Sequence, residues 1–166
     1  MDAIILAAGY GTRLGEITEN CPKPLLKVAG KPVIEHILNK LEELDIVNKI
    51  YIVTNDKFEQ NFNQWIHTLS PKKPVEIIND GTKSNEDRLG ALGDIHYAVS
   101  LKKIENDTIV VAGDNLFEFP LNEVVSLFRK TDSNVIVLHD VKDIVLAKHY
   151  GVVEVKNNIV IDYEEK

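Results

Sequence analysis

Two glycines and an arginine follow the first apolar run of the chain, where the sequence reads GYGTRL over residues 9–14. Gly9 and Gly11 lack the Cβ that keeps a backbone away from a ligand. Backbone N–H groups in such a loop are free to bind phosphate oxygens. The pattern alone fits phosphate binding and a simple tight turn about equally well. Its place after an apolar run matters, because ligands bind at the carboxyl ends of strands in open α/β sheets.

A lysine and an aspartate further along the chain are candidates for chemistry on a phosphate. Lys23 lies between Pro22 and Pro24, whose rings restrict the backbone around it. A lysine held in this way suits a fixed positive charge, although an isolated Pro-Lys-Pro is more often a solvated loop. Asp114 follows the apolar run at residues 108–111. Mg²⁺ prefers one or two carboxylates with phosphate oxygens and water, so Asp114 fits either a metal ligand or an ordinary turn residue.

Two better-known phosphate motifs do not fit the loop. The dinucleotide fingerprint needs Gly-x-Gly-x-x-Gly, but the next glycine comes one residue late, at Gly15. The acidic residue expected after the second strand is also missing, because Thr54 and Asn55 occupy that place. Asp56 with Glu59 resembles a helix capping box instead. A P-loop needs Gly-Lys-Ser/Thr, which the chain lacks, so the loop disfavours both a P-loop enzyme and an NAD(P)-dependent oxidoreductase.

The bulk composition is that of an ordinary globular chain. Its 166 residues are 44% hydrophobic and 27% charged, which suits one domain with a buried core. A net charge of −7 argues against a nucleic-acid partner, which needs a clustered basic surface. Cys21 is the sole cysteine, so an internal disulfide is excluded and a reducing compartment is the default. The histidines lack ligand-like spacing, which disfavours structural zinc.

The apolar segments are too short to cross a membrane, which takes about 18 apolar residues. The run at residues 3–8 has no preceding basic residues and stops at Gly9, so it predicts a buried strand rather than a signal peptide. We therefore expect a soluble, cytoplasmic protein with no membrane partner.

Short apolar runs alternate with amphipathic stretches. Five runs rich in isoleucine and valine predict strands buried on both faces of a sheet, at residues 3–6, 49–53, 75–78, 108–111 and 135–138. Two more strands, at residues 151–155 and 159–163, predict an antiparallel hairpin with an Asn157-Asn158 turn.

Helix-spaced apolar residues lie between the predicted strands. They form four stripes, which begin at Val33, Phe58, Leu92 and Leu121. Pro32 suits the first helical position before the first stripe. The alternation predicts an α/β domain of three α/β/α layers, Rossmann-like, with right-handed crossovers and a mostly parallel, mixed sheet.

The glycine loop and the lysine segment together resemble the signature of the sugar nucleotidyltransferases. These enzymes make NDP-sugars from sugar 1-phosphates and nucleoside triphosphates. The resemblance starts at residues 9–14 and 22–25 and continues in order through 113–115 (GDN), 150–153 (YGVV) and 165–166 (EK). It covers essentially the whole chain, and it implies the nucleotide-diphospho-sugar transferase type of Rossmann-like fold.

The resemblance also implies roles for individual residues. Arg13 would hold the phosphates and stabilise departing pyrophosphate, Lys23 would sit between the α-phosphate and the sugar phosphate, and Asp114 would hold Mg²⁺. Cations that position two anions and neutralise developing charge would then provide most of the catalysis. The implied nucleotide-binding residues are Ala8, Gly9, Gly11, Thr12, Arg13, Asn79 and Gly90.

The implied acceptor site lies at the end of the chain, with Gly151, Glu165 and Lys166 against the sugar phosphate. The segment at residues 79–94 is expected to read the base. Residues 80–88 depart from pyrimidine- and guanine-selecting patterns, so base identity stays open, and Arg88 is either a ligand contact or a surface charge.

Relatives usually continue well beyond the position of Lys166. The chain is therefore expected to be a nucleotidyltransferase core, residues 1–166, that lacks the C-terminal part of the family domain and any second metal-binding aspartate there. An enzyme and a nucleotide-binding module without turnover both remain open, as do a phosphocholine-like acceptor and a homo-oligomer.

Overall fold

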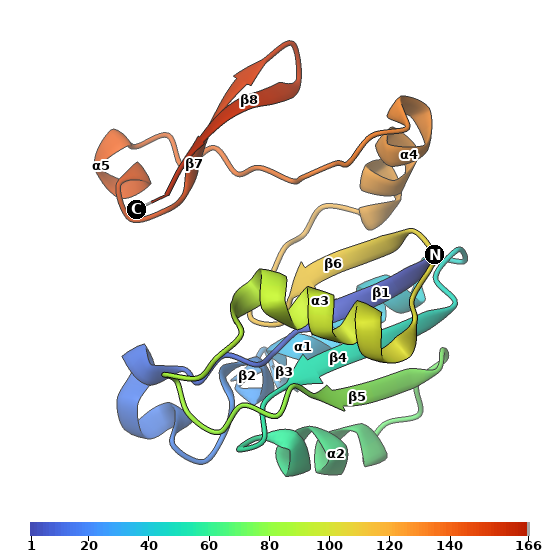
Figure 1. Ribbon diagram of the computed structural model, residues 1–166, viewed down its shortest axis with the longest axis vertical. Coiled ribbons are helices and arrows are strands. Elements are labelled where there is room, and N and C mark those ends of the chain that lie inside the picture. The colour runs from blue at the N-terminus through green and yellow to red at the C-terminus, as the bar shows by residue number, and fades with distance from the viewer. Residues whose placement is uncertain (166) are drawn as a thin grey trace. The chain divides into compact units, whose positions relative to one another are not determined.

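The computed structural model describes residues 1–165, apart from the side chain of Arg13. The chain divides into two compact units, Met1–Glu123 and Val124–Lys166. Figure 1 shows the elements of both.

The first unit is built on a four-stranded parallel sheet. Its strands are β1 (Asp2–Leu6), β4 (Lys49–Thr54), β5 (Val75–Asn79) and β6 (Thr108–Ala112), in the order β5-β4-β1-β6. β1 is central and pairs with β4 on one side and with β6 on the other, all in parallel. Four of the five strands predicted from apolar runs are thereby confirmed. All four strands run parallel, and the antiparallel pairs occur in separate small sheets.

Helices cover both faces of this sheet (Figure 1). They are α1 (Val33–Glu42), α2 (Glu59–His67) and α3 (Gly90–Lys102). Ile4, Tyr51 and Val53 form a buried cluster with Ala98 of α3. Their strand neighbours Ala3, Ile5, Ile50 and Ile52 are also fully buried. Because successive strand residues face opposite sides, these neighbours face the side that α1 and α2 cover. The first unit therefore has the predicted α/β/α layers.

Two 3₁₀ segments and a short hairpin link β1 to α1. They are η1 (Thr12–Thr18), η2 (Lys23–Leu25), β2 (Lys27–Val28) and β3 (Lys31–Pro32). Pro32 is the N-cap of α1, with an extended ψ of 143°, rather than its first helical residue as predicted. The fixed φ of proline still serves the helix entry from this position.

The predicted capping box at the start of α2 is wrong. Phe58 occupies the N-cap, and no side-chain hydrogen bond caps the helix there. The Asp56 and Glu59 carboxylates instead accept hydrogen bonds from the Asn79 amide, at 3.1 and 3.0 Å. Asn79, at the end of β5, therefore binds both carboxylates that the capping box would have used.

The prediction for the third stripe was right about the helix and wrong about one of its core positions. Leu92 is 83% exposed, whereas Asp94 and Ala98 are buried. Apolar residues lie on most sides of α3, so their spacing did not single out the face that packs on the sheet.

The second unit holds most of α4 (Leu121–Thr131), then α5 (Ile144–Ala147), β7 (Val152–Lys156) and β8 (Ile159–Glu164). β7 and β8 form the predicted antiparallel hairpin, with positive φ at Asn157 and Asn158 in the turn. The Asp143 carboxylate caps α5 by accepting from the Val145 and Leu146 amides.

The fifth predicted strand is wrong, because residues 135–138 are not in a strand. A strand needs a hydrogen-bonded neighbour, and none among residues 1–165 pairs with this segment. Three apolar side chains of the run, at Ile136, Val137 and Leu138, are exposed. Among the described residues, no helix is long and apolar enough to span a membrane.

Candidate functional site

The carboxyl ends of all four parallel strands carry the loops that hold the candidate site. β1 leads into the glycine loop, β6 into Asp114, β4 into Asn55, and β5 into residues 80–89, here named the β5–α3 loop. Parallel strands end at the same edge of a sheet, so segments far apart in sequence meet there.

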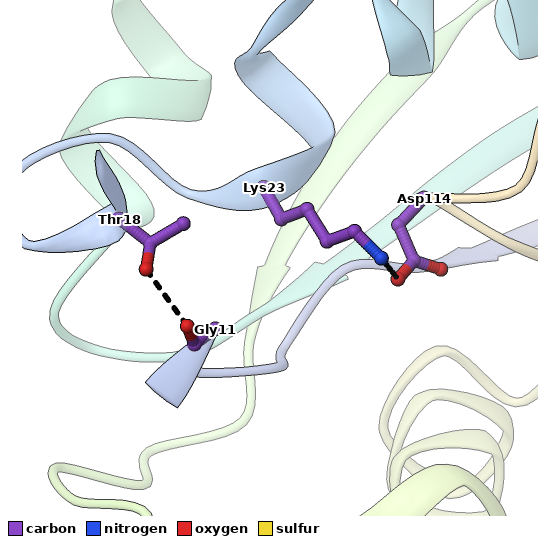
Figure 2. Close-up of polar contacts among 4 residues, drawn as sticks. All are labelled: Gly11, Thr18, Lys23 and Asp114. Carbon is purple, nitrogen blue, oxygen red and sulfur yellow. Dashed lines mark hydrogen bonds and ion pairs between the residues drawn. The ribbon is translucent and has the colours of Figure 1, made fainter. Parts of the chain in front are cut away.

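Gly11 holds the turn of the glycine loop. Its φ of 66° lies in the left-handed region, and a Cβ built on it would come within 2.9 Å of the Thr18 side chain. The Thr18 hydroxyl donates to the Gly11 carbonyl at 2.8 Å and thereby closes the loop (Figure 2). Glycine at position 11 is therefore required by the loop itself.

Gly9 differs from Gly11. It has no positive φ, and a Cβ at this position would meet no atom of the described residues within 4 Å. The protein's own packing thus places no demand for glycine at position 9, and the open space beside it suits the close approach of a ligand.

Lys23 and Asp114 lie together, although 91 residues separate them in sequence. The Lys23 Nζ donates to Asp114 Oδ2 at 2.7 Å (Figure 2). The two side chains are 46% and 37% exposed, so both can reach a ligand. An ammonium group has three N–H donors, and Asp114 takes one of them. The sequence-predicted cation and carboxylate therefore meet at one exposed place.

Each partner of this pair is held by its backbone. Lys23 begins η2, where the Leu26 amide donates to the Lys23 carbonyl at 3.1 Å. The Gly113 amide donates to the Leu6 carbonyl at 2.7 Å, and a Cβ on Gly113 would lie 2.9 Å from that oxygen. Gly113 thus lets the end of β6 pack against β1, which sets Asp114 beside the start of the glycine loop.

Three more residues of the glycine loop were predicted to bind the nucleotide. Ala8 is buried and Thr12 is exposed at the start of η1. The backbone of Arg13 is part of η1, and its side chain lies outside the described part of the structure.

Asn55 is a site residue that the sequence interpretation missed. It is fully buried, and its amide donates to the Ala8 carbonyl at 2.8 Å. Its side-chain oxygen accepts from the Phe58 amide at 3.1 Å. Asn55 therefore anchors the start of the glycine loop to the turn before α2. Its only sequence signal was a polar residue directly after a buried strand.

Asn55→Ala is expected to destabilise the fold by about 1–3 kcal/mol, because it leaves the Ala8 carbonyl without this buried donor, whereas the Phe58 amide keeps its bond to the Asn55 backbone carbonyl. Urea unfolding of the variant measures this loss. Asn61→Ala is the matched control, since Asn61 makes one exposed hydrogen bond, to the Asn20 carbonyl. Equal stability of the two variants would contradict the anchoring role.

Asn79 ends β5, and its side chain is fully engaged within the protein. Its amide donates to Asp56 and Glu59, and its oxygen accepts from the Gly81 amide at 2.8 Å. The structure thus gives Asn79 a role in shaping the β5–α3 loop. Gly90 begins α3 with a φ of 75°, and a Cβ there would meet nothing within 4 Å. Binding of a nucleotide by either residue stays a prediction.

Within the β5–α3 loop, the Asp87 carboxylate accepts from the amides of Lys83 and Ser84. Arg88 donates to the Asn85 carbonyl at 2.8 Å. The Asp87 pKa is lowered, chiefly because those two backbone amides stabilise its charged form. Arg88 therefore has a local structural contact in this loop.

Two buried aspartates flank the same loop. Asp80 follows β5, and Asp94 lies in the second turn of α3. Burial and the neighbouring Asp80 raise the pKa of Asp94 to about 7. The sequence interpretation singled out neither residue, because the apolar spacing of α3 directed attention to its leucines and valines.

The predicted acceptor residues lie in the second unit. Gly151 precedes β7, and a Cβ on it would come within 2.9 Å of the Tyr163 hydroxyl oxygen, so the hairpin itself favours glycine there. Glu165 is exposed after β8. Lys166 lies outside the described residues. Their contact with a sugar phosphate stays a prediction.

The single carboxylate of Asp114 is compatible with a Mg²⁺ ion that takes its other ligands from phosphate and water. Among residues 1–165, no group of three or more histidine, cysteine, aspartate or glutamate side chains could form a complete protein cage. Mg²⁺ does not require one, because it binds through one or two carboxylates and completes its shell with phosphate oxygens and water. The exposed Asp114 carboxylate meets that need.

A glycine loop, a lysine and an aspartate lie together at the carboxyl edge of a parallel sheet, which is where ligands bind in open α/β proteins. The family model for nucleotidyl transferases matches residues 2–166. The chain therefore belongs to the nucleotidyl transferase family, as the sequence resemblance indicated.

Curated relatives agree with this assignment. The chain is 36% identical to the bifunctional protein GlmU of Methanococcus aeolicus, over 100% of this chain and 36% of the relative. It is 31% identical to a putative mannose-1-phosphate guanyltransferase of Sulfolobus acidocaldarius, over 100% of this chain and 44% of the relative. It is 30% identical to the UTP–glucose-1-phosphate uridylyltransferase AglF of Haloferax volcanii, over 92% and 59%. The chain thus spans only part of each of these relatives.

Solved structures share the fold. A UDP-glucose pyrophosphorylase complexed with UDP-glucose superposes with a TM-score of 0.77 at 22% identity, covering 99% of this chain and 68% of that one. HddC from Yersinia pseudotuberculosis, complexed with GMP-PN, gives a TM-score of 0.72 at 26% identity, covering 99% and 69%. The parallel sheet with helices is therefore the fold of the nucleotide-diphospho-sugar transferases.

Proposed function

We propose that the chain forms the reaction core of an enzyme that transfers a nucleoside monophosphate from a nucleoside triphosphate to a sugar 1-phosphate. The meeting of Lys23 with Asp114 beside the glycine loop supports this proposal most strongly. A phosphocholine-like phosphate is an alternative acceptor with the same reacting group. The names of the relatives support sugar phosphates in particular.

In the proposed reaction, an oxygen of the acceptor phosphate attacks the α-phosphorus of the triphosphate. The bond from that phosphorus to the bridging oxygen breaks, and pyrophosphate leaves with the electron pair. The amides of the open glycine loop at Gly9 and Gly11 bind phosphate oxygens. Lys23 lies between the two phosphates and reduces their repulsion, and Arg13 stabilises the charge on pyrophosphate.

Asp114 holds Mg²⁺ in this proposal, and the ion supplies charge neutralisation on the phosphate oxygens. Lys23 has further N–H donors besides the one given to Asp114, so it keeps the carboxylate oriented while contacting phosphate. The proposed core domain is residues 1–166, and in this proposal Gly151, Glu165 and Lys166 contact the acceptor phosphate. A cytoplasmic location and a lack of nucleic-acid or membrane partners complete the proposal.

A pyrophosphate-release assay tests the function directly. The intact protein is incubated with Mg²⁺, each of the four ribonucleoside triphosphates and dTTP, against a set of hexose 1-phosphates and phosphocholine. We expect pyrophosphate release that depends on both substrates and on Mg²⁺. Nucleotide binding without turnover in every combination would favour a binding module instead.

A further inference from the structure

Asp80 and Asp94 each present a buried carboxylate oxygen that has no hydrogen-bond partner among the described residues when both groups are ionised. These atoms are Asp80 Oδ2 and Asp94 Oδ1. The residues are only 7% and 6% exposed. A buried unpartnered carboxylate oxygen is costly, so two on neighbouring residues need a physical explanation.

The hydrogen bonds around Asp80 differ from those around Asp94. Its Oδ1 accepts from the Thr82 amide at 2.8 Å and from the Thr82 hydroxyl at 2.7 Å. Both partners donate, as they do to a carboxylate. Among the described residues no comparable set of donors reaches Asp94, and the charged group that acts on it is Asp80. A proton on Asp94 would therefore give both unpartnered oxygens a role.

We propose that Asp80 and Asp94 share one proton, carried by Asp94 and donated to Asp80, and that this hydrogen bond fixes the β5–α3 loop against α3 for nucleotide binding. Asp80 and Asp94 thus act as positioning residues. The link to nucleotide binding rests on the proposed function, whereas the shared proton and the fixed loop do not.

The fixed loop is connected to the glycine loop. The Tyr10 hydroxyl donates to Thr82 Oγ1 at 3.2 Å, and Thr82 in turn donates to Asp80. The chain of donors therefore runs from the glycine loop through Thr82 and ends on the Asp80 carboxylate. A change at Asp94 acts on a loop that also contacts the phosphate-binding segment.

The charges around the pair leave Asp94 as its titrating member near neutral pH. Burial is the largest cause of the raised Asp94 pKa, followed by the charge of Asp80. α3 packs on β1 and β4, where Tyr51 is the titratable member of the shared core cluster, and α3 itself contributes Tyr97.

Across the loop, burial raises the pKa of Tyr10, so its hydroxyl remains a donor throughout this range. Asp87 has a lowered pKa and stays charged. His96 places an exposed imidazole on the same helix, α3. It therefore requires its own control.

The sign of the pH effect follows from the raised pKa. Below pH 7, Asp94 keeps its proton and the loop stays fixed. As the pH rises through about 7, two buried carboxylates become charged together, repel each other and release the loop. If the fixed form alone binds nucleotide, the dissociation constant rises about tenfold between pH 6 and pH 8.

Asp94→Asn is the decisive variant, because its amide donates to Asp80 without titrating. Two readouts are compared with the wild type from pH 6 to pH 8.5: amide hydrogen exchange of residues 80–89 and the dissociation constant of Mg²⁺–nucleoside triphosphate. At each pH, the wild-type exchange rate and dissociation constant are divided by those of Asp94→Asn. This ratio removes the pH dependence of intrinsic amide exchange and of the nucleotide's own protonation. We expect both ratios to rise through about pH 7, and Asp94→Ala to show weak protection and weak binding at every pH.

Two matched controls should keep the wild-type pH profile. Glu86→Gln removes an exposed carboxylate from the same loop, and His96→Gln removes the exposed imidazole of α3. Flat ratios for Asp94→Asn would overturn the proposal, as would loss of the pH effect in His96→Gln. A pH-dependent exchange ratio in a protein that binds no triphosphate would support the shared proton and refute the proposed function. Normal turnover with flat ratios would support the proposed function and refute the shared proton.

Discussion

Lys23→Ala is expected to lower kcat/KM for nucleotidyl transfer by about 10²- to 10³-fold, the loss typical of removing one charge-stabilising group from a reaction centre. The reason is that Lys23 is a fixed cation next to Asp114, at the edge of the sheet where the phosphates are proposed to meet. Steady-state pyrophosphate release measures the loss. Arg13→Ala is expected to act in the same direction, through the charge on the leaving pyrophosphate.

The matched control is Lys27→Ala, which removes an exposed lysine from β2 and should leave kcat/KM unchanged. Lys23→Ala should also unfold within about 1 kcal/mol of the wild type, because exposed ion pairs contribute little to stability. Lys23→Arg should recover little activity, since the planar guanidinium does not replace a compact ammonium group. Near-normal turnover in both Lys23→Ala and Arg13→Ala would reject the assignment.

The four parallel strands and the candidates Lys23 and Asp114 could be identified from the sequence because their signals are local. A strand buried on both faces needs a continuous apolar run, and β1, β4, β5 and β6 each have one. Lys23 and Asp114 each belong to a short motif, and the parallel order of the strands brings those motifs together. The pattern gave no distance, but it predicted the edge of the sheet at which they meet.

The errors arose where long-range partners decide the outcome. Asp56 and Glu59 have the spacing of a capping box, yet Asn79 claims both carboxylates from another strand. The run at residues 135–138 has strand composition, but composition does not supply a partner strand. In both cases the local sequence allows the predicted structure, but contacts with other elements decide whether it forms.

Asn55 and Asp94 were missed for a related reason. A buried polar residue has meaning through the groups it contacts, and those groups lie on other elements: Ala8 for Asn55 and Asp80 for Asp94. In α3 the apolar residues surround the helix, so periodicity favoured Leu92 for the core although Asp94 is the buried residue. Residues that position loops, such as Asn55 and Asp94, are thus harder to identify from a single sequence than motif residues such as Lys23 and Asp114.

Asp114→Asn is expected to reduce kcat by at least about 10²-fold at saturating substrate, because it removes the carboxylate proposed to hold Mg²⁺. The amide keeps the size of the side chain and a neutral acceptor for the Lys23 ammonium, so the fold should be preserved. Turnover measured against Mg²⁺ concentration separates two causes of the loss. A metal-holding role predicts that the variant needs far more Mg²⁺ for half-maximal activity, whereas an effect through Lys23 alone leaves that concentration unchanged.

Asp107→Asn is the matched control, since Asp107 lies just before the opposite end of the same strand, β6, and is exposed. It should change neither kcat nor the Mg²⁺ requirement. The double variant Lys23→Ala/Asp114→Asn adds a further test. Because the two side chains touch and are proposed to serve one reacting phosphate, their effects should be less than additive. Fully additive losses would show that the ion pair does not act as a unit, even if each residue matters alone.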